Sequence, residues 1–224
     1  MRVGIDGRML TSRRTGIGNY TFEIIKVLAS SFTRDIQFYV YSNDEIILPS
    51  DLCEGWILRI DRNPYTSRLK STLWLKLVCG FFCKKDNLDV FLAFGTFYPF
   101  LSRSVYRISF VYDFTYLLHP HTMGKFHRIS FRTFFLRDIK SSNFVVSISN
   151  GTAEKLLTFS NRRNDLVVYP GVSNVFRELD PKELSMFSSG MPQRDKFILT
   201  VGTLEPRENL GFLIHVFSKM KTEG

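Results

Sequence analysis

Short apolar runs that alternate with helical patterns place the strongest limit on how this 224-residue chain can fold. Each run is bounded by turn residues and is long enough for one strand, which is typical of strands buried on both faces of a parallel sheet. The expected strands are residues 3–6, 36–41, 56–60, 89–94, 106–113, 143–149, 165–172 and 197–201. The sequence therefore predicts an α/β fold in which a parallel sheet is flanked by helices.

Apolar residues at helical spacing predict helices over residues 20–32, 67–83, 122–140 and from 210 onward. In the second of these, Leu69, Leu73, Leu77 and Phe81 form one apolar stripe, and Lys76 is among the basic residues beside it. One interpretation is a buried domain helix whose lysines are solvated. The other is a helix that lies on an anionic membrane surface, where basic residues and protruding aromatic residues both bind.

The net charge favours anionic partners but does not distinguish one class of anionic partner from another. Thirty Lys and Arg residues against 21 Asp and Glu leave a net charge of +9, which suits nucleic acid, an anionic membrane surface or a phosphate-bearing ligand. The helix over residues 122–140 interleaves Phe with Lys and Arg, but no nucleic-acid-binding module surrounds it. Nucleic acid is therefore not expected as a partner.

The sequence contains neither a membrane span nor a leader that we can identify. No uncharged run approaches the ~20 residues that a membrane-spanning helix requires, and residue 1 leads directly into a strand. We expect a cytoplasmic protein, or one that is peripheral on the inner face of the membrane. Cys53, Cys79 and Cys83 lack companions at metal-ligand spacing, so they are expected to be reduced, mostly buried thiols, and no metal site is predicted.

The loop after the first strand contains Gly16 and Gly18, which precede the expected helix and follow arginines at positions 8, 13 and 14. Glycines let a ligand approach the backbone N–H groups of a helix N-terminus, so this loop is predicted to face a phosphate. A dinucleotide fingerprint would have a third glycine where Thr21 stands, which disfavours a dehydrogenase. The alternative is that both glycines only shape a turn.

Polar or small residues follow the next strands as well. Gly95 and Thr96 end one strand, Asp113 ends the next, and a helix capped by Asn150 or Thr152 follows the one after. Ligands of open α/β sheets bind beyond the carboxyl ends of the strands, so Gly95, Thr96 and Asp113 are expected to line a cleft there. Otherwise, a lone Asp at a strand end is a cap or a turn residue.

Two stretches resemble a known family. Residues 202–210 match eight of the nine positions of Gly-Thr-Leu-Glu-Pro-Arg-Lys-Asn-Leu, and residues 3–21 share a strand, Asp-Gly-Arg, a loop, Thr-Gly-Ile-Gly and a helix. In these features the chain resembles family 4 of the retaining, nucleotide-sugar-dependent glycosyltransferases with the GT-B fold. The resemblance implies two Rossmann-like domains: an acceptor-side domain over residues 1–175, a linker over 176–195, and the truncated start of a nucleotide-sugar-binding domain over 196–224.

The resemblance also implies a function. The family transfers a sugar from a nucleotide-diphosphate sugar to a glycan or lipid-linked acceptor in polysaccharide biosynthesis, with retention of configuration and without a metal or other cofactor. For this chain the implied sugar is mannose or a similar hexose. The implied donor is GDP-mannose or a UDP-hexose.

Positions that match the family's motifs carry its residue roles onto this chain. The donor-binding positions are Gly16, Gly18, Gly202, Thr203 and Arg207. The acceptor and sugar side of the cleft corresponds to Tyr112, His119 and Ser149, and the catalytic position corresponds to Asp113. Gly95 and Thr96 are assigned to the same side of the cleft from their place at a strand end. Tyr112 replaces the family's histidine, and a phenol can hydrogen-bond a sugar hydroxyl but does not titrate near neutral pH.

A second departure concerns the donor. Glu208 stands where the family has a phosphate-binding lysine, and this reversal of charge opposes diphosphate binding by ~1 kcal/mol or more. The family's downstream Glu-x7-Glu region is not in the sequence either. We therefore expect a truncated chain that does not bind the donor measurably and whose first domain folds alone. The alternative functions are a catalytically inactive fragment and a module that binds anionic membranes.

Overall fold

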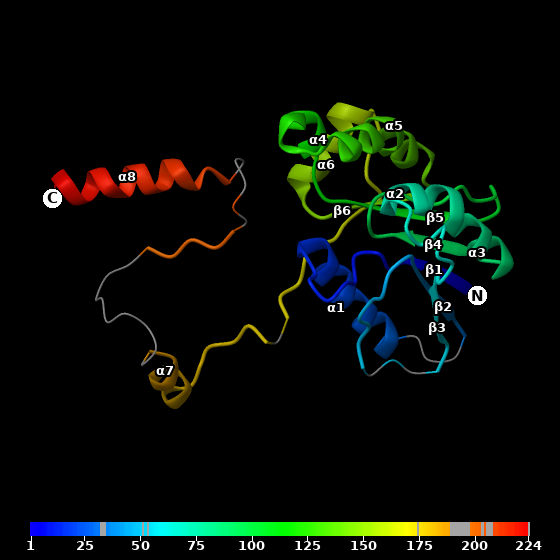
Figure 1. The fold of residues 1–224 in the computed structure, drawn as a ribbon, viewed down its shortest axis with the longest axis horizontal. Helices are drawn as coiled ribbons and strands as arrows, with labels where there is room; N and C mark the ends of the chain where they lie inside the picture. The colour runs from blue at the N-terminus through cyan, green and yellow to red at the C-terminus, as the bar shows by residue number, and fades with distance from the viewer. Residues whose placement is uncertain are drawn as a thin grey trace. The chain divides into compact units, whose positions relative to one another are not determined.

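The computed structural model of the chain describes residues 1–31, 35–50, 52, 54–173, 175–188, 198–202, 204 and 208–223. They divide into two compact units. The first unit is Met1–Leu118 with Lys125–Gly171, and the second is His119–Gly124 with Val172–Gly224. The first unit contains the sheet, so the candidate site is built there (Figure 1).

The first unit is built on a seven-stranded sheet in which every pair of neighbours is parallel. The strands are β1 (Arg2–Asp6), β2 (Gln37–Ser42), β3 (Trp56–Ile60), β4 (Val90–Ala93), β5 (Tyr106–Val111), β6 (Phe144–Ser147) and β7 (Leu166–Val167). Their order is β3-β2-β1-β4-β5-β6-β7, so the chain reverses its direction of winding between β1 and β4. The predicted α/β fold with a Rossmann-like parallel sheet is confirmed.

Helices cover both faces of this sheet, with α1 on one face and α2, α3, α4, α5 and α6 on the other (Figure 1). Their bounds are α1 (Gly16–Ser31), α2 (Ser71–Trp74), α3 (Gly80–Lys85), α4 (Thr115–Leu118), α5 (Lys125–Ser141) and α6 (Asn150–Ser160). A π-helical turn, η1 (Leu75–Cys79), joins α2 to α3, and a 3-10 turn, η2 (Pro120–Thr122), precedes α5.

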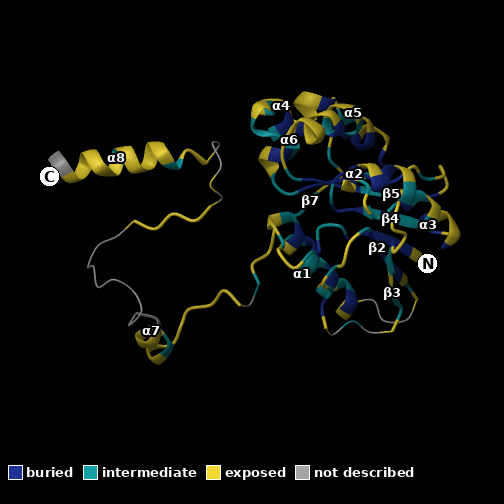
Figure 2. Ribbon diagram, viewed as in Figure 1, coloured by how far each residue is buried: buried dark blue, intermediate teal, exposed yellow. Residues whose placement is uncertain are grey.

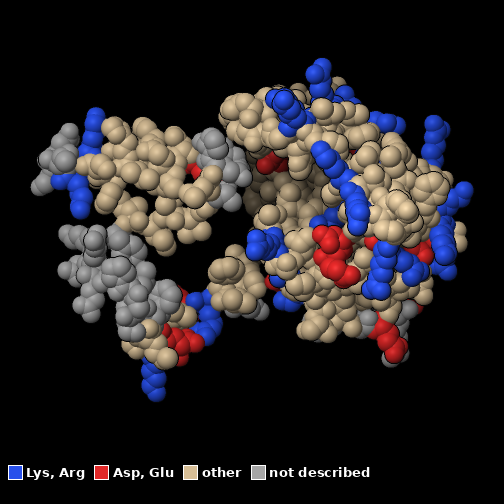
Figure 3. Space-filling view, viewed as in Figure 1, with Lys and Arg blue, Asp and Glu red and all other residues tan. Residues whose placement is uncertain are grey.

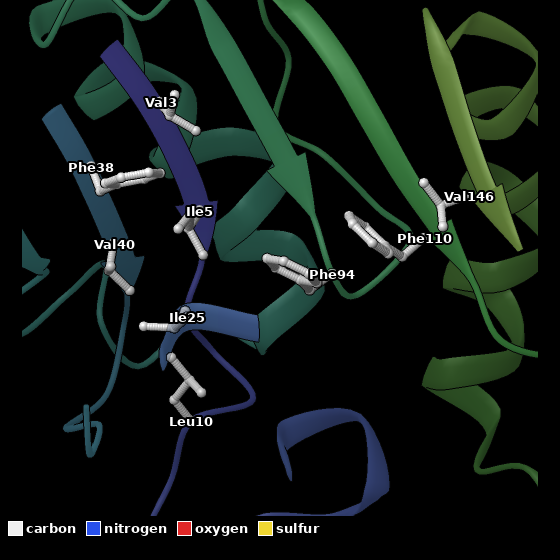
Figure 4. Packing of buried hydrophobic residues seen from close by; sticks show 9 residues of the cluster. All are labelled: Val3, Ile5, Leu10, Ile25, Phe38, Val40, Phe94, Phe110 and Val146. Atoms are coloured by element: carbon white, nitrogen blue, oxygen red, sulfur yellow. The ribbon is translucent and has the colours of Figure 1, made fainter. Parts of the chain in front are cut away.

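The face of the sheet under α1 is apolar. Alternate residues of β1, including Val3 and Ile5, point to this face and pack against Ile25 of α1, while Asp6 points to the other face. The buried cluster comprises Val3, Ile5, Leu10, Ile25, Phe38, Val40, Phe94, Phe110 and Val146 (Figure 4). Burial of apolar surface is the main force that holds this side of the unit together.

The opposite face of the sheet contains buried charges. Asp86 is 7% exposed, accepts a hydrogen bond from the Tyr41 hydroxyl at 2.8 Å and pairs with the Arg59 guanidinium at 2.8 Å. Asp61 accepts a hydrogen bond from the Trp74 indole N–H at 2.7 Å. Each of these buried carboxylates therefore has a partner, as groups of this kind require.

The helix predicted over residues 67–83 faces the sheet with the opposite side from the one that the buried-helix interpretation requires. Its predicted apolar stripe is exposed, at 36% for Leu73, 49% for Leu77 and 76% for Phe81. The buried side is a second stripe: Thr72, Trp74, Leu75, Lys76, Cys79 and Cys83. The buried side includes the large apolar side chains Trp74 and Leu75, and Lys76 is buried beside them with an acidic partner inside the unit.

That partner is Asp138 of α5. The Lys76 ammonium donates to the Asp138 carboxylate and to the Tyr98 carbonyl at 2.7 Å, and the ring of Phe134 lies 4.8 Å from the ammonium nitrogen. Burial lowers the pKa of Lys76 and raises the pKa of Asp138, since it opposes the charge on both groups. The expectation that the lysines of this helix are solvated is wrong for Lys76.

Replacing Lys76 with Met should lower the free energy of unfolding by about 3–5 kcal/mol, because the Asp138 carboxylate would stay buried without a counter-charge. The matched control is Lys26→Met, which breaks the exposed Lys26–Glu23 pair and should change stability by less than ~1 kcal/mol. Denaturant unfolding measures both. The double variant Lys76→Met with Asp138→Leu should recover most of the loss; no recovery would contradict this account.

The second unit contains α7 (Pro181–Ser188) and α8 (Leu210–Glu223). Helix α7 begins with a capping box: Glu183 N–H donates to the Asp180 carboxylate at 2.8 Å and Asp180 N–H donates to the Glu183 carboxylate at 3.1 Å. Helix α8 is exposed along most of its length (Figure 2). The predicted helix from residue 210 is confirmed.

The strand predicted over residues 197–201 is not formed. Residue 197 lies outside the described chain, and residues 198–202 carry no strand. Ile198, Leu199 and Val201 are 61%, 73% and 88% exposed. A parallel strand needs a neighbour that accepts and donates its backbone hydrogen bonds, and no described segment pairs with this run.

Candidate functional site

The carboxyl edge of the sheet collects most of the residues that the sequence singled out. Gly95 and Thr96 follow β4, Tyr112 and Asp113 follow β5, and Ser149 follows β6. Because β1, β4, β5 and β6 are neighbours, the ends of these strands lie along one edge of the sheet, where α1 also begins. The edge includes the switch point between β1 and β4, the usual ligand position in such folds.

Helix α1 begins at Gly16, four residues before the predicted start, so Gly16 and Gly18 form its first turn rather than a preceding loop. The first helical hydrogen bond runs from Asn19 N–H to the Thr15 carbonyl at 2.9 Å. The N–H groups of residues 16–18 therefore have no acceptor within the helix. Such groups bind anions readily when a ligand reaches them.

The two glycines are required for different reasons. A Cβ added to Gly18 would lie 2.3 Å from the Met9 carbonyl oxygen, so only glycine lets the loop pass this close to the helix. A Cβ added to Gly16 would meet no atom within 4 Å. Gly18 thus shapes the loop, and the conformation of Gly16 leaves room for a ligand or for a side chain.

Gly18→Ala should destabilise the first unit by about 1–3 kcal/mol, since overpacking of this kind forces the backbone to shift. Gly16→Ala is the matched control, and it should be neutral or stabilising by up to ~1 kcal/mol because Ala favours the helix. Thermal unfolding of the two variants measures the difference. Equal effects at both positions would mean that the close approach to Met9 is not a constraint.

An ion pair that sequence reasoning missed lies at the end of β1. The Arg8 guanidinium donates to the Asp6 carboxylate through Nε at 2.8 Å and Nη2 at 2.7 Å, and its Nη1 donates to the Ser71 hydroxyl at 2.9 Å. The Arg8 side chain is only 7% exposed. Its charge is therefore neutralised by Asp6 rather than offered to a phosphate. The sequence signal for this ion pair is an Asp and an Arg two residues apart at the end of a strand.

Gly95 makes room for this pair. A Cβ on Gly95 would lie 3.0 Å from the Asp6 carboxylate and 2.7 Å from the Met9 methyl group. Thr96 next to it has a left-handed φ of 70° and donates its hydroxyl to the Phe110 carbonyl at 2.7 Å. Both residues shape the strand end, and the Thr96 hydroxyl is already used inside the unit.

Tyr112 packs inward. Its ring meets the ring of Tyr20 edge to face at 5.7 Å, on the side of the sheet that α1 covers. Burial raises the pKa of the Tyr112 phenol, so the group is a neutral hydroxyl across the physiological range. Tyr112 therefore cannot supply the titration that a histidine would provide at this position.

Asp113 and Ser149 cap helices. Asp113 Oδ1 accepts a hydrogen bond from Thr115 N–H at 2.9 Å at the start of α4, and its side chain is otherwise exposed. Ser149 Oγ accepts from Thr152 N–H at 3.1 Å and is the N-cap of α6, so the prediction that Asn150 or Thr152 caps this helix is wrong. Asp113 keeps a second carboxylate oxygen that can bind a ligand.

The remaining predicted positions lie in the second unit or outside the described residues. In the second unit, the His119 ring lies 6.0 Å from the His121 ring, and the Glu208 carboxylate lies 3.6 Å from the place of a Cβ on Gly202. Thr203 and Arg207 lie outside the described residues, as does Cys53. The predicted buried thiols at Cys79 and Cys83 are confirmed.

Comparison with known proteins does not identify a family. No family model matches the chain, and no curated protein matches it. Within the described part of the chain, no group of three or more His, Cys, Asp or Glu side chains is arranged to hold a metal ion. None of the helices in that part is long and apolar enough to cross a bilayer.

Proposed function

We propose that this chain is the acceptor-side part of a retaining GT-B hexosyltransferase. The reaction would move mannose or a similar hexose from a nucleotide-diphosphate sugar to a glycan or lipid-linked acceptor, at the cytoplasmic side of a membrane. The observation that carries the proposal is the switch-point edge, where the first turn of α1 and the ends of β4 and β5 meet. The motif at residues 202–210 supports the same class.

We assign roles at this edge according to which polar groups still have hydrogen-bonding capacity for a ligand. The N–H groups of residues 16–18 would bind the oxygens of a phosphate, and the helix dipole adds to that attraction. The free Asp113 oxygen would accept a hydrogen bond from the acceptor hydroxyl. Arg8, Thr96 and Ser149 would support the geometry, because their polar groups already have partners.

Asp113→Asn should weaken acceptor binding about tenfold, since it removes a charge-assisted hydrogen bond while its amide oxygen can still cap α4. Asp113→Ala should lose both the binding and ~1 kcal/mol of stability. Amide chemical shifts at residues 16–18 and 113, recorded with free and lipid-linked oligosaccharides, measure the binding. The proposal fails if no acceptor moves these signals, or if the Asn variant binds as well as the original chain.

The donor is expected to bind poorly because of Glu208. Its carboxylate lies over Gly202, where the matched family motif would hold a phosphate. Glu208→Lys should strengthen GDP or UDP binding about tenfold or more, because it replaces a repulsion by an attraction. Glu208→Gln is the intermediate control. Calorimetry that gives the unchanged chain sub-millimolar affinity for GDP-mannose or UDP-glucose would contradict the prediction.

A second candidate function is binding to an anionic membrane surface. Leu73, Leu77 and Phe81 form an exposed apolar row on α2, η1 and α3. Exposed Ile129 on α5 lies among Lys and Arg residues, and Figure 3 shows such side chains over α3 and α5. The Lys70 ammonium lies 4.2 Å from the centre of the Phe126 ring. This contact shows that the beginning of α2 lies next to the beginning of α5. Trp74 of α2 is buried and does not contribute to this exposed row.

Changing Lys125, Arg128 and Arg132 together to Glu should weaken cosedimentation with phosphatidylglycerol vesicles at low salt, because each basic residue contributes ~1 kcal/mol near an anionic surface. Changing Lys155, Arg163 and Lys182 to Glu produces the same net charge elsewhere and should have a smaller effect. Equal loss in both variants, or equal binding to neutral vesicles, would exclude a specific membrane face.

A further inference from the structure

A cavity lies at the opposite edge of the sheet from the candidate site. It has a volume of about 580 Å³ and lies between α3 and the segment that precedes β5, at the amino ends of β4 and β5. Its lining residues are Gly80, Cys83, Lys84, Asn87, Leu88, Phe100, Leu101, Ser102, Ser104 and Val105. This volume falls within the range of sites that bind small molecules.

The walls of the cavity are fixed without a ligand. Gly80 of α3 lies so close to the Phe100 carbonyl oxygen that a Cβ there would be 2.8 Å from it. The Phe100 ring meets the Phe134 ring at 6.3 Å, and the Arg137 guanidinium lies 5.6 Å from its centre. Val105 N–H donates to the Ser102 carbonyl at 3.2 Å and closes a turn. A preformed wall reduces the entropy lost on binding.

Lys84 is the one charged residue among those that line the cavity. Its ammonium forms no ion pair with the described residues, whereas Lys76, two turns earlier, is fully paired. A ligand in the cavity would therefore lie beside a lysine that has no acidic partner among the described residues. Such a charge favours an anion.

Hydroxyl and amide groups from segments outside α3 provide further hydrogen-bond donors at the cavity. The Ser104 hydroxyl donates to the Ser102 oxygen at 3.0 Å, and Ser104 N–H donates to the same oxygen at 3.4 Å. Because the Ser102 oxygen already accepts these bonds, its own proton is free for an external acceptor. Asn87, two residues after the end of α3, has a left-handed φ of 50° and is one of the lining residues, so it can offer a side-chain amide.

We propose that this cavity binds an organic phosphate, with the phosphate oxygens at Lys84, Ser102 and Asn87. A phosphate offers more acceptor oxygens than a carboxylate, which suits donors that come from three separate parts of the wall. The organic part would lie on the apolar residues Leu88, Leu101 and Val105. The phosphate could belong to a free metabolite or to a lipid headgroup, and the site is separate from the proposed acceptor edge.

The test titrates the whole chain with glycerol 3-phosphate and with inorganic phosphate while amide chemical shifts are recorded. Saturable shifts are expected at Lys84, Asn87, Ser102 and Ser104, with tighter binding of the organic phosphate. Lys84→Gln should weaken the affinity about tenfold, the effect of losing a charge-assisted hydrogen bond. Lys85→Gln is the matched control, since Lys85 belongs to the same helical turn but does not line the cavity.

A flotation assay with phosphatidylglycerol vesicles distinguishes the two sources. Glycerol 3-phosphate binding that depends on Lys84 would identify a free organophosphate as a ligand, and vesicle binding alone with the same dependence would identify the lipid headgroup. The proposal is overturned if neither probe shows a dependence on Lys84, or if Lys85→Gln has the same effect as Lys84→Gln.

Discussion

The buried pair between Lys76 and Asp138 determines how the helical layer is placed on the sheet. It joins η1 to α5, two segments far apart in the sequence, and the Tyr98 carbonyl and N–H complete the hydrogen bonds of both charges. Burial opposes the charge on each partner, so the pair adds little net stability compared with an apolar contact of the same size. Its effect is on specificity: the helix can face the sheet with only one side.

This constraint divides the first unit into two unlike halves. Under α1 the core is apolar and tolerates a change of side chain provided that the volume is kept. Under α2, η1 and α3 it contains charged groups that must all keep their partners, including Asp6 with Arg8 and Asp86 with Arg59. The candidate site lies at the edge of the charged half, where the Asp6–Arg8 pair fixes the start of the loop that leads to α1.

Sequence reasoning was most successful where burial leaves a strong signal. The strands that became β1 to β6 are apolar because both faces of the sheet are covered, and so they were found within a few residues. For the helix at residues 71–85 the sequence pattern favours the wrong buried face, because a lysine counts as a surface residue until its distant acidic partner is known. The run at residues 198–201 has the composition of a strand, but composition cannot supply the neighbouring strand that it needs.

The same limit applies to the site. The sequence located the carboxyl edge through Gly95, Thr96 and Asp113, because strand ends can be recognised from apolar runs. It could not show that Thr96 and Ser149 direct their hydroxyls into the backbone, or that Arg8 is neutralised, since these facts depend on local geometry. Asp113, with one oxygen free, remains the predicted residue with the most capacity to bind a ligand at this edge.

The thiols of η1 and α3 provide a way to measure how this helical segment moves relative to the sheet. Cys79 and Cys83 are 0% and 2% exposed with their sulfurs 3.8 Å apart, and burial raises the pKa of Cys79. An alkylating reagent reacts with an exposed thiolate, so the fully buried Cys79, which does not line the cavity, cannot react while the helix lies on the sheet. The rate of alkylation at Cys79 thus measures how often this helix separates from the sheet, without any label being introduced.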